Sequence, residues 1–335
     1  MTPVADATVR TTPAPAPHAG RTARHWVLGG VGAGDRIYDW AIAGSALVVP
    51  LLLLLILFAV GIAGWPALRT FGLGFITSSE WDPVKLQFGA GPAIYGTLVS
   101  SALALLIATP LALGSAIFLS EFSPAWLRQP VAFTVDLLAA IPSVVYGLWG
   151  IFVLIPLLRD HVAPFFKETL HLGSLPLFAG PDYGPSMLAA GVILAIMVLP
   201  YIAAVTREVV TAVPRSQREA ALALGATRWE TIRDAVIPYA RSGIIGGIML
   251  GLGRALGETM AVTMLIGNNH QISASLLAPG YTMASLIANE FSEATNDLHL
   301  SALMAVGFVL LLLTFLINAI ARWLVWRTAR AAGAV

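Results

Sequence analysis

Long uncharged apolar stretches constrain this chain more than any other feature of its sequence. The first contains VVPLLLLLILFAVGIA and has no charged residue between Asp39 and Arg69. Several such stretches reach the roughly 20 residues with which an α-helix crosses a bilayer. Charged residues make up 11% of the 335 residues, whereas soluble domains contain about 25%. The composition excludes a soluble protein and predicts an all-α polytopic membrane protein with about six transmembrane helices.

The apolar stretches divide the chain into six expected spans and four regions. The spans are expected at about 38–63, 93–120, 131–158, 186–205, 243–267 and 300–321. The third is expected to bend at Pro142 and Gly147, and the loop after the first to carry short interfacial helices anchored by Trp65 and Trp81. The expected regions are a disordered tail (1–36), a first transmembrane helix with its external loop (37–92), a core domain (93–326) and a C-terminal tail (327–335).

The distribution of positive charge predicts the orientation of these spans. Nearly all arginines lie in the N-terminal tail, in the link EFSPAWLRQP, in the segment 207–241 and near the C-terminus. The opposite loops carry only Arg69, Lys85, Arg159 and Lys167. Because cytoplasmic loops are enriched in Lys and Arg, both ends of the chain and the segment 207–241 are predicted to be cytoplasmic.

Several classes of site are absent from the sequence. The chain has no cysteine, and its six histidines show no pair at metal-ligand spacing on one helix, so no metal site is expected. The net charge of +1 gives no reason to expect a nucleic-acid partner. No GxxxxGK[ST] pattern for ATP occurs, and no nucleophile with a base is visible. The chain is therefore not expected to be an enzyme.

The segment 207–241 reads as a capped pair of short helices. Ser216 and Thr227 each precede a glutamate by three residues, the spacing of a capping box that starts a helix. Gly225 lies where a left-handed residue ends the first helix, which is expected to begin near Gln217. Pro238 is expected to end the second.

Two interpretations of this hairpin are open. It could be a well-capped loop of no special purpose. Its apolar residues beside charged ones also fit a docking surface. The residues concerned are Ala220, Ala221, Leu222, Leu224 and Trp229, with Arg218, Arg228 and Arg233 around them.

The hairpin resembles the EAA loop of ABC importer permeases. The resemblance rests on Glu219, Ala220 and Ala221, on Gly225 four residues later, and on Ile237 and Pro238. The family pattern ends I-x-L-P, and this chain departs from it with Ala235 and Ile237 at the I and L positions. In that family the loop fits a cleft of a cytoplasmic ATPase and transmits its closure. The resemblance therefore implies that Glu219, Ala220, Ala221 and Gly225 couple the chain to an ATPase.

The helix after the hairpin carries two charges among glycines. Gly243, Gly247 and Gly251 lie on one stripe of a helix, and an advance of about 100° per residue places Arg254 and Glu258 on the same stripe. Both charges are then expected to face a neighbouring helix or a cavity.

A charge at this depth costs roughly 2.5 to 3.5 kcal/mol on insertion scales, so it needs an explanation. Arg254 and Glu258 could be a self-neutralising pair that fixes helix packing, since residues four apart can pair. Alternatively, Arg254 could bind an anion reversibly, because its planar donor fork matches phosphate or carboxylate oxygens.

Other polar residues near the spans have ordinary interpretations. Asp136 is expected to be solvated or to cap a helix. Arg207 and Glu208 are expected to form an interfacial pair, with contact to a departing anion as an alternative. Ser143, Tyr146 and Thr259 could line the pathway, although the sequence does not give their directions.

Longer motifs resemble the PstC-type permeases of the phosphate-specific ABC importer. They are EWDPVKLQFGAGPAIYGTLV, LLAAIPSVVYGLWG, LAAGVILAIMVLPYIAAV, GGIMLGLGRALGETMAV and SLIANEF, in the family's order over nearly all the chain after Asp35. The resemblance implies a type I ABC importer (MetI-like) permease fold, with 93–326 as its core domain. It also implies that Arg254 and Glu258 act in phosphate passage.

The same resemblance implies partners and a location. They are a second permease of PstA type, two copies of a PstB-type ATPase that binds ATP and Mg, and a periplasmic PstS-type phosphate-binding protein, in the bacterial cytoplasmic membrane. This chain itself is expected to hold no cofactor. An importer for another oxyanion, such as sulfate or molybdate, is the nearest alternative. A secondary transporter driven by ion gradients is a more distant one.

Overall fold

The computed structural model describes residues 33–181 and 183–331. It falls into two units, residues 1–55 and 56–335. The described part of the first unit belongs to the helix α1, whose side chains between Val48 and Leu55 are exposed. Most of the expected N-terminal tail and the last four residues lie outside the described residues.

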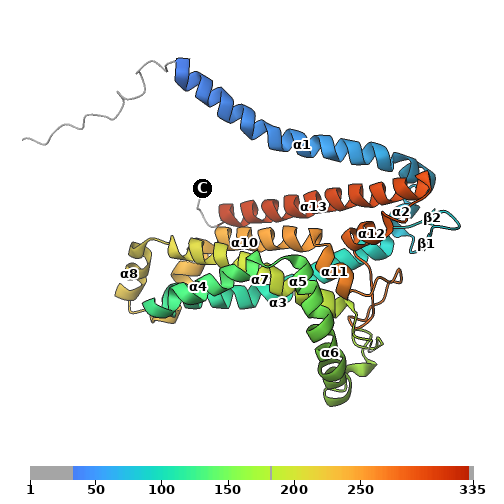
Figure 1. Ribbon diagram of the computed structural model, residues 1–335. Helices are drawn as coiled ribbons and strands as arrows, with labels where there is room; N and C mark the ends of the chain where they lie inside the picture. The colour runs from blue at the N-terminus through green and yellow to red at the C-terminus, as the bar shows by residue number, and fades with distance from the viewer. Residues whose placement is uncertain (1–32, 182, 332–335) are drawn as a thin grey trace, which may run out of the picture. The chain divides into compact units, whose positions relative to one another are not determined.

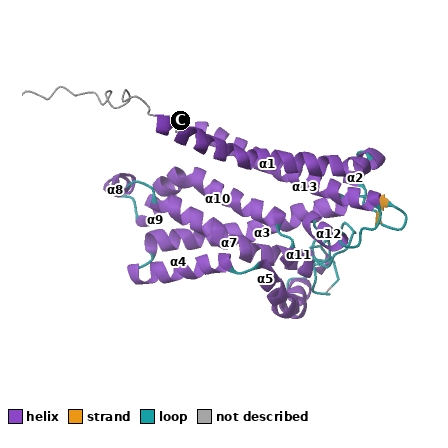
Figure 2. Cartoon of the chain, turned by 45° about the horizontal axis from the view of Figure 1, so that its top comes forward, coloured by secondary structure: helices purple, strands orange, loops and turns teal. Residues whose placement is uncertain are grey.

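The described chain is helical apart from loops and one short hairpin of strands (Figure 1, Figure 2). The α-helices are α1 (Ala33–Phe71), α2 (Gly74–Thr77), α3 (Gly91–Ile117), α4 (Ala125–Ala140), α5 (Ser143–Trp149), α6 (Ile155–Leu157), α7 (Met187–Thr211), α8 (Arg215–Ala223), α9 (Arg228–Thr231), α10 (Ile237–Gly257), α11 (Met260–Leu265), α12 (Met283–Glu290) and α13 (Asp297–Ala331). Wider π-helical turns are η1 (Phe118–Phe122), η2 (Gly150–Leu154), η3 (Leu158–Val162), η4 (Phe165–Thr169) and η6 (Ile232–Val236), and η5 (Leu172–Ser174) is a 3-10 turn. The strands β1 (Trp81–Asp82) and β2 (Gln87–Phe88) pair antiparallel, with Trp81 opposite Phe88.

Six helical runs are long and apolar enough to cross a membrane, so the predicted number of spans is confirmed for the described residues. They are Tyr38–Phe71, Gly91–Phe122, Ser143–Thr169, Met187–Thr211, Arg228–Gly257 and Asp297–Trp323.

The predicted third span, 131–158, is wrong in its limits. The helix α4 ends at Ala140, Ile141 and Pro142 are extended, and a new helical run begins at Ser143 and continues to Thr169. A residue before proline is disfavoured in the α conformation, so Pro142 forces a break here where a bend was expected. The segment 159–169, expected in a loop, is helical.

The centre of the second unit is a bundle of three long helices, α3, α7 and α10 (Figure 1, Figure 2). Small residues let α3 and α7 approach closely, because Ala104, Ala108 and Ala112 on one face of α3 are fully buried in the same cluster as Ala190 and Leu194 of α7. Membrane helices lack a hydrophobic driving force for association, so close backbone packing supplies much of their cohesion.

A second packed cluster joins the end of α1, α2, β2, the start of α3, α12 and the start of α13. Trp81 does not anchor an interfacial helix as expected; it lies in β1 and contacts Phe88 with ring centroids 5.0 Å apart. Trp65 likewise lies within α1, where it is exposed. At Gly96 of α3, an added Cβ would lie 1.9 Å from the Tyr281 carbonyl oxygen, so this close approach requires glycine.

Candidate functional site

The first helix of the hairpin, α8, begins earlier than its sequence suggested. Its N-terminal flanking residue is Pro214, which makes no side-chain cap, and Ser216 lies inside the first turn. The predicted capping box of Ser216 and Glu219 is therefore wrong. A serine caps a helix only from the flanking position, where its backbone is non-helical.

The end of α8 and the start of α9 follow the prediction. Gly225 has φ +87, and its N–H donates to the Leu222 carbonyl while that of Ala226 donates to the Ala221 carbonyl, the two bonds of a Schellman motif. Thr227 and Glu230 form the predicted capping box, in which the Thr227 N–H donates to Glu230 Oε2 at 2.7 Å.

Apolar side chains of the hairpin are left uncovered within this chain. Leu222, Leu224 and Trp229 are 48%, 90% and 55% exposed, and Glu219 and Ala220 are also exposed. Ala221 is half-buried. Leucines and a tryptophan so exposed on a rigid, capped hairpin form a surface suited to a protein partner.

Arg218 does not belong to the rim of that surface, where the sequence interpretation had placed it. Its Nη2 donates to Glu121 Oε1 at 2.7 Å and to the Val210 carbonyl oxygen at 2.8 Å, and its Nη1 donates to the Val213 carbonyl. Arg218 thus fastens α8 to the end of α7 and to η1 at the end of α3. Sequence reasoning missed this link because Glu121 lies 97 positions away.

Pro238 does not end the second helix of the hairpin, contrary to expectation. The π-helical turn η6 directly precedes α10, and Pro238 occupies the first turn of α10. A proline lacks an N–H and clashes with the carbonyl four residues before it, and a wider turn relieves both conflicts. The hairpin therefore continues into the membrane-spanning helix as one helical run, Arg228–Gly257.

The glycine stripe of α10 packs against α7 of the same chain. Added Cβ atoms on Gly243, Gly247 and Gly251 would lie 2.5, 3.2 and 2.8 Å from side-chain atoms of Val209, Val205 and Ile202, respectively. The stripe was predicted, and the helix it faces is α7 of this chain. Gly246, Gly253 and Gly257 have no atom within 4 Å of an added Cβ, so a second face of α10, about 100° around the helix from the stripe, is open in this chain.

Arg254 lies beside this stripe and faces α7. Its guanidinium carbon is 4.7 Å from the centroid of the Tyr201 ring, and its buried Nε has no hydrogen-bond partner. In the described part of the chain Arg254 forms no ion pair. The interpretation of Arg254 as half of a self-neutralising pair is therefore not supported by the geometry.

Glu258 leaves the helical phase that would have placed it near Arg254. The helix α10 ends at Gly257, and Glu258 is extended with ψ 126. Its Oε1 accepts a 3.4 Å hydrogen bond from the Ala261 N–H in the first turn of α11. A pairing four residues apart needs a continuous helix, and this break removes it.

A second helix break lies next to Tyr201. Where α4 ends, the Tyr201 hydroxyl donates to the Ala139 carbonyl at 3.3 Å and the Tyr146 hydroxyl donates to the Leu138 carbonyl at 2.8 Å. The last carbonyls of a helix lack partners within it, and these two hydroxyls bond carbonyls of that last turn; the Leu138 carbonyl also accepts from the Ile141 N–H at 3.4 Å. Tyr146 was a candidate pathway residue, whereas sequence reasoning missed Tyr201 because nothing local signals its contact with Arg254.

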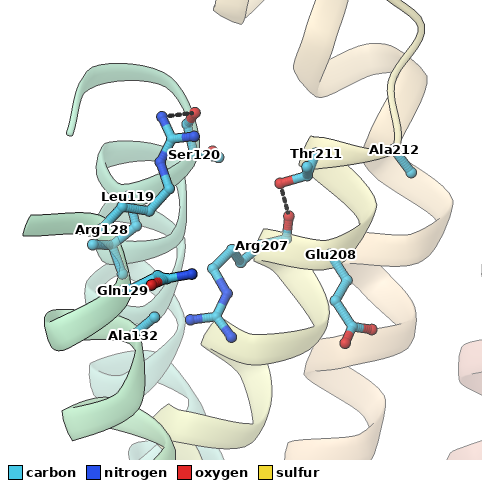
Figure 3. Close-up of a pocket in the computed structure, with 9 residues that line it drawn as sticks. All are labelled: Leu119, Ser120, Arg128, Gln129, Ala132, Arg207, Glu208, Thr211 and Ala212. Atoms are coloured by element: carbon cyan, nitrogen blue, oxygen red, sulfur yellow. Dashed lines mark hydrogen bonds between the residues drawn. The ribbon is translucent and has the colours of Figure 1, made fainter. Parts of the chain in front are cut away.

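A pocket of about 560 Å³ lies at the C-terminal end of α7, between η1, α4 and α7. Figure 3 shows Arg207 directed toward α4 and Glu208 directed away from it. Arg207 Nη2 lies 3.2 Å from Asp136 Oδ2, so the expected pair of Arg207 with Glu208 is wrong and Asp136 is not simply solvated. Adjacent helical residues point in different directions, which explains the difference. Arg128 donates to the Ser120 and Ser123 carbonyls at 3.2 and 3.3 Å and so closes the other side.

No group of three His, Asp or Glu side chains gathers as metal ligands would within residues 33–181 and 183–331. Four polar side chains lie around the helix breaks of the membrane-spanning core: Arg254, Tyr201, Tyr146 and Glu258. Arg254 contacts Tyr201, both tyrosines bond the end of α4, and Glu258 lies at the break between α10 and α11.

Comparison with known proteins identifies the family to which this chain is similar. The family described as "Binding-protein-dependent transport system inner membrane component" matches residues 108–330. The phosphate transport system permease protein PstC of Mesorhizobium japonicum is 49% identical over 302 residues, which cover 90% of this chain and 92% of that protein. PstC of Xylella fastidiosa is 50% identical over 274 residues, 81% of this chain and 84% of that protein. PstC 2 of Mycobacterium tuberculosis is 43% identical over 299 residues, 86% of this chain and 91% of that protein.

Two solved structures share the fold. A chain of the methionine ABC transporter MetNI in an inward-facing conformation aligns with a TM-score of 0.53 at 19% identity, over 70% of this chain and 94% of its own. A chain of a bacterial ABC transporter involved in the import of the acidic polysaccharide alginate aligns with a TM-score of 0.53 at 18% identity, over 86% and 97%. The predicted type I ABC importer permease fold is confirmed.

Proposed function

Because this chain belongs to the PstC family of phosphate transport permeases, within the binding-protein-dependent inner membrane components, we propose that it forms the membrane pathway of an ATP-driven importer of inorganic phosphate. It is a multi-pass permease subunit, and the chemistry of ATP hydrolysis belongs to a separate subunit. The fold, the family and the six membrane-spanning runs support the same role.

The observation that carries the phosphate pathway is the state of Arg254. A guanidinium stays charged at any physiological pH, and a charge inside a membrane needs a partner. Within the described chain that partner is only the face of an aromatic ring, and the Nε has no acceptor. A phosphate oxygen would complete the site, since the guanidinium fork matches two of its oxygens.

Glu258 completes the proposed pathway in a different way. It lies at the break between α10 and α11, four positions after Arg254 but out of its helical phase. A carboxylate near the site and not bonded to Arg254 keeps the field from becoming so positive that phosphate is held too tightly for release. Glu258 thereby favours passage over tight binding.

The hairpin transmits the energy of ATP hydrolysis in this proposal. Glu219, Ala220, Ala221 and Gly225 belong to the surface that docks onto a PstB-type ATPase, which binds ATP and Mg. The second helix of the hairpin continues without interruption from Arg228 to Gly257, three residues past Arg254. A displacement of the docked hairpin therefore moves the anion site along the same helical run.

The proposed assembly follows the family. A PstA-type permease completes the membrane pathway, two PstB-type ATPase subunits lie on the cytoplasmic side, and a PstS-type binding protein delivers phosphate from the periplasm. The hairpin and both chain ends lie in the cytoplasm of a bacterium, and the lipid bilayer surrounds the six spans. The excess of arginine in the predicted cytoplasmic segments supports this orientation.

Transport by the complex reconstituted in vesicles tests the proposal. We expect uptake of radioactive phosphate to require ATP and the ATPase, and sulfate or molybdate in tenfold excess to leave it unchanged. Sulfate uptake indifferent to phosphate would assign the chain to another oxyanion. Phosphate uptake that persists without the ATPase would indicate a secondary transporter.

A further inference from the structure

We propose that Tyr201 is the positioning residue of the anion site: its ring holds the Arg254 guanidinium in place, and its hydroxyl ties that site to the break between α4 and α5. This inference rests on the proposed passage of phosphate past Arg254. It assigns a function to a residue of α7 that carries no charge and lies 53 positions before Arg254.

The backbones around Tyr201 fix where its ring can lie. The glycine stripe brings α10 so close to α7 that an added Cβ on Gly251 would lie 2.8 Å from Ile202 Cγ1. Tyr201 precedes Ile202, and Arg254 follows Gly251 by less than one turn. The contact of 4.7 Å between guanidinium and ring centroid is therefore held by helix packing on both sides.

The chemistry of this contact suits a transport site better than an ion pair would. A carboxylate partner would accept hydrogen bonds from the guanidinium fork and compete with phosphate for the same donors. An aromatic face attracts the cation through its quadrupole and accepts no such pair of hydrogen bonds. Tyr201 can thus stabilise the buried charge of Arg254 while leaving its donors available to an anion.

The hydroxyl of Tyr201 connects the site to a second element. It donates to the Ala139 carbonyl at 3.3 Å, in the last turn of α4 before the break at Ile141 and Pro142. Tyr146 makes a similar bond to the Leu138 carbonyl from the other side of the break. A shift of the end of α4 would therefore move the ring on which Arg254 rests.

A graded change of ring electrostatics at constant volume separates this role from packing. Phenylalanine and its mono-, di- and trifluorinated derivatives are incorporated at position 201 in the full complex. We expect the initial rate of phosphate uptake to fall at each step, by about tenfold over the series, because each fluorine weakens the attraction of the ring for a cation. The same series at Tyr239, an exposed tyrosine of α10, is the matched control and is expected to leave the rate unchanged.

Two substitutions with standard amino acids test the hydroxyl and the ring of Tyr201 separately. Tyr201→Phe keeps the ring and removes only the bond to Ala139, so uptake is expected to fall about twofold to fivefold. Tyr201→Leu keeps apolar volume and removes the ring, and we expect it to be at least as slow as the trifluorinated variant. Expression and assembly with the other subunits are measured for each variant.

The results distinguish this inference from the proposed function. Equal uptake across the fluorinated series, or Tyr201→Leu as active as Tyr201→Phe, would overturn the positioning role of the ring. If Arg254→Gln abolishes uptake in the same assay while the Tyr201 variants show no effect, the proposed phosphate pathway remains and only the role of Tyr201 is wrong. If Arg254→Gln transports normally, the pathway assignment itself is wrong, and the inference falls with it.

Discussion

Arg218 and Arg254 lie 36 positions apart, on the hairpin and on the membrane-spanning helix that continues it, and their surroundings differ in every respect. Arg218 donates to a carboxylate and to two backbone carbonyls. Arg254 rests on an aromatic ring, and its buried Nε has no acceptor. The protein itself supplies the hydrogen-bond acceptors of Arg218, whereas the donors of Arg254 stay available to a bound anion.

Whether the protein fills the hydrogen-bond donors of an arginine distinguishes a structural charge from a functional one better than its burial or its sequence context. Both arginines belong to segments that resemble the family, and both were candidates for function. A guanidinium whose fork is filled by the protein fastens elements together, as Arg218 fastens α8 to α7 and η1. A guanidinium whose charge is stabilised without filling the fork is suited to a ligand that comes and goes.

The largest effect is expected at Arg254. Arg254→Gln removes the charge and the fork, and we expect phosphate uptake by the reconstituted complex to fall at least about 100-fold, as for loss of a charge-assisted contact of about 3 kcal/mol. Co-purification with the other subunits should be unchanged, because no partner within the described chain loses a hydrogen bond. Loss of assembly in Arg254→Gln would favour a packing role and remove the contrast with Arg218.

A smaller effect, on stability and on uptake per ATP hydrolysed, is expected at the ion pair of Arg218 with Glu121. Glu121→Gln leaves the guanidinium with only carbonyl acceptors, and we expect the chain to lose roughly 1–3 kcal/mol of stability, since the pair is about one-fifth exposed. Uptake per ATP hydrolysed should fall while ATPase docking persists. The exchange Arg218→Glu with Glu121→Arg should restore part of the loss. Equal coupling in all variants would mean that the pair transmits nothing.

The glycine contacts offer a matched test of the packing that positions Arg254. An added Cβ at Gly243 would meet both Cγ atoms of Val209 at 2.5 Å, and a β-branched side chain has few rotamers with which to yield. Gly243→Ala is therefore expected to cost about 1–3 kcal/mol, as for an overpacked core. Gly246→Ala, with open space around its Cβ, should stay within about 0.5 kcal/mol. Thermal unfolding in detergent compares the two, and equal midpoints would contradict the packing of α10 on α7.

Local signals in the sequence predicted what depends on a few neighbouring residues. The left-handed Gly225, the capping box at Thr227 and the glycine stripe of α10 all follow from spacing within one or two turns. Long apolar runs predicted the six spans for the same reason. The fold class also followed from longer motifs, because their order along the chain is specific.

What depends on distant contacts or on helix continuity could not be read from the sequence. Placing Glu258 near Arg254 assumed an unbroken helix, but α10 ends at Gly257 without a proline to signal it. The partners Glu121 of Arg218 and Tyr201 of Arg254 lie on other elements, and only the packed structure brings them together. The break at Pro142 could have been predicted from the sequence, because a proline disfavours the α conformation of the residue before it, here Ile141. A bend was expected at Pro142 instead.

The smallest expected effect concerns a buried imidazole, which, unlike the guanidinium of Arg254, can be neutral. His270, in the loop after α11, stacks on Trp81 and contacts the tilted ring of Tyr281, with centroid distances of 5.9 and 4.6 Å, and this burial lowers its pKa below the ordinary 6.5. A folded-state pKa below the unfolded one means that the unfolded chain binds more protons, so stability is fully present above about pH 6.5 and falls as the pH is lowered through the folded pKa. We expect the unfolding midpoint to fall as the pH is lowered below about 6.5, and His270→Gln to flatten this part of the profile. A profile equally steep in the variant would place the titration elsewhere. Arg254 has no such route to neutrality, which is why it needs the face of Tyr201.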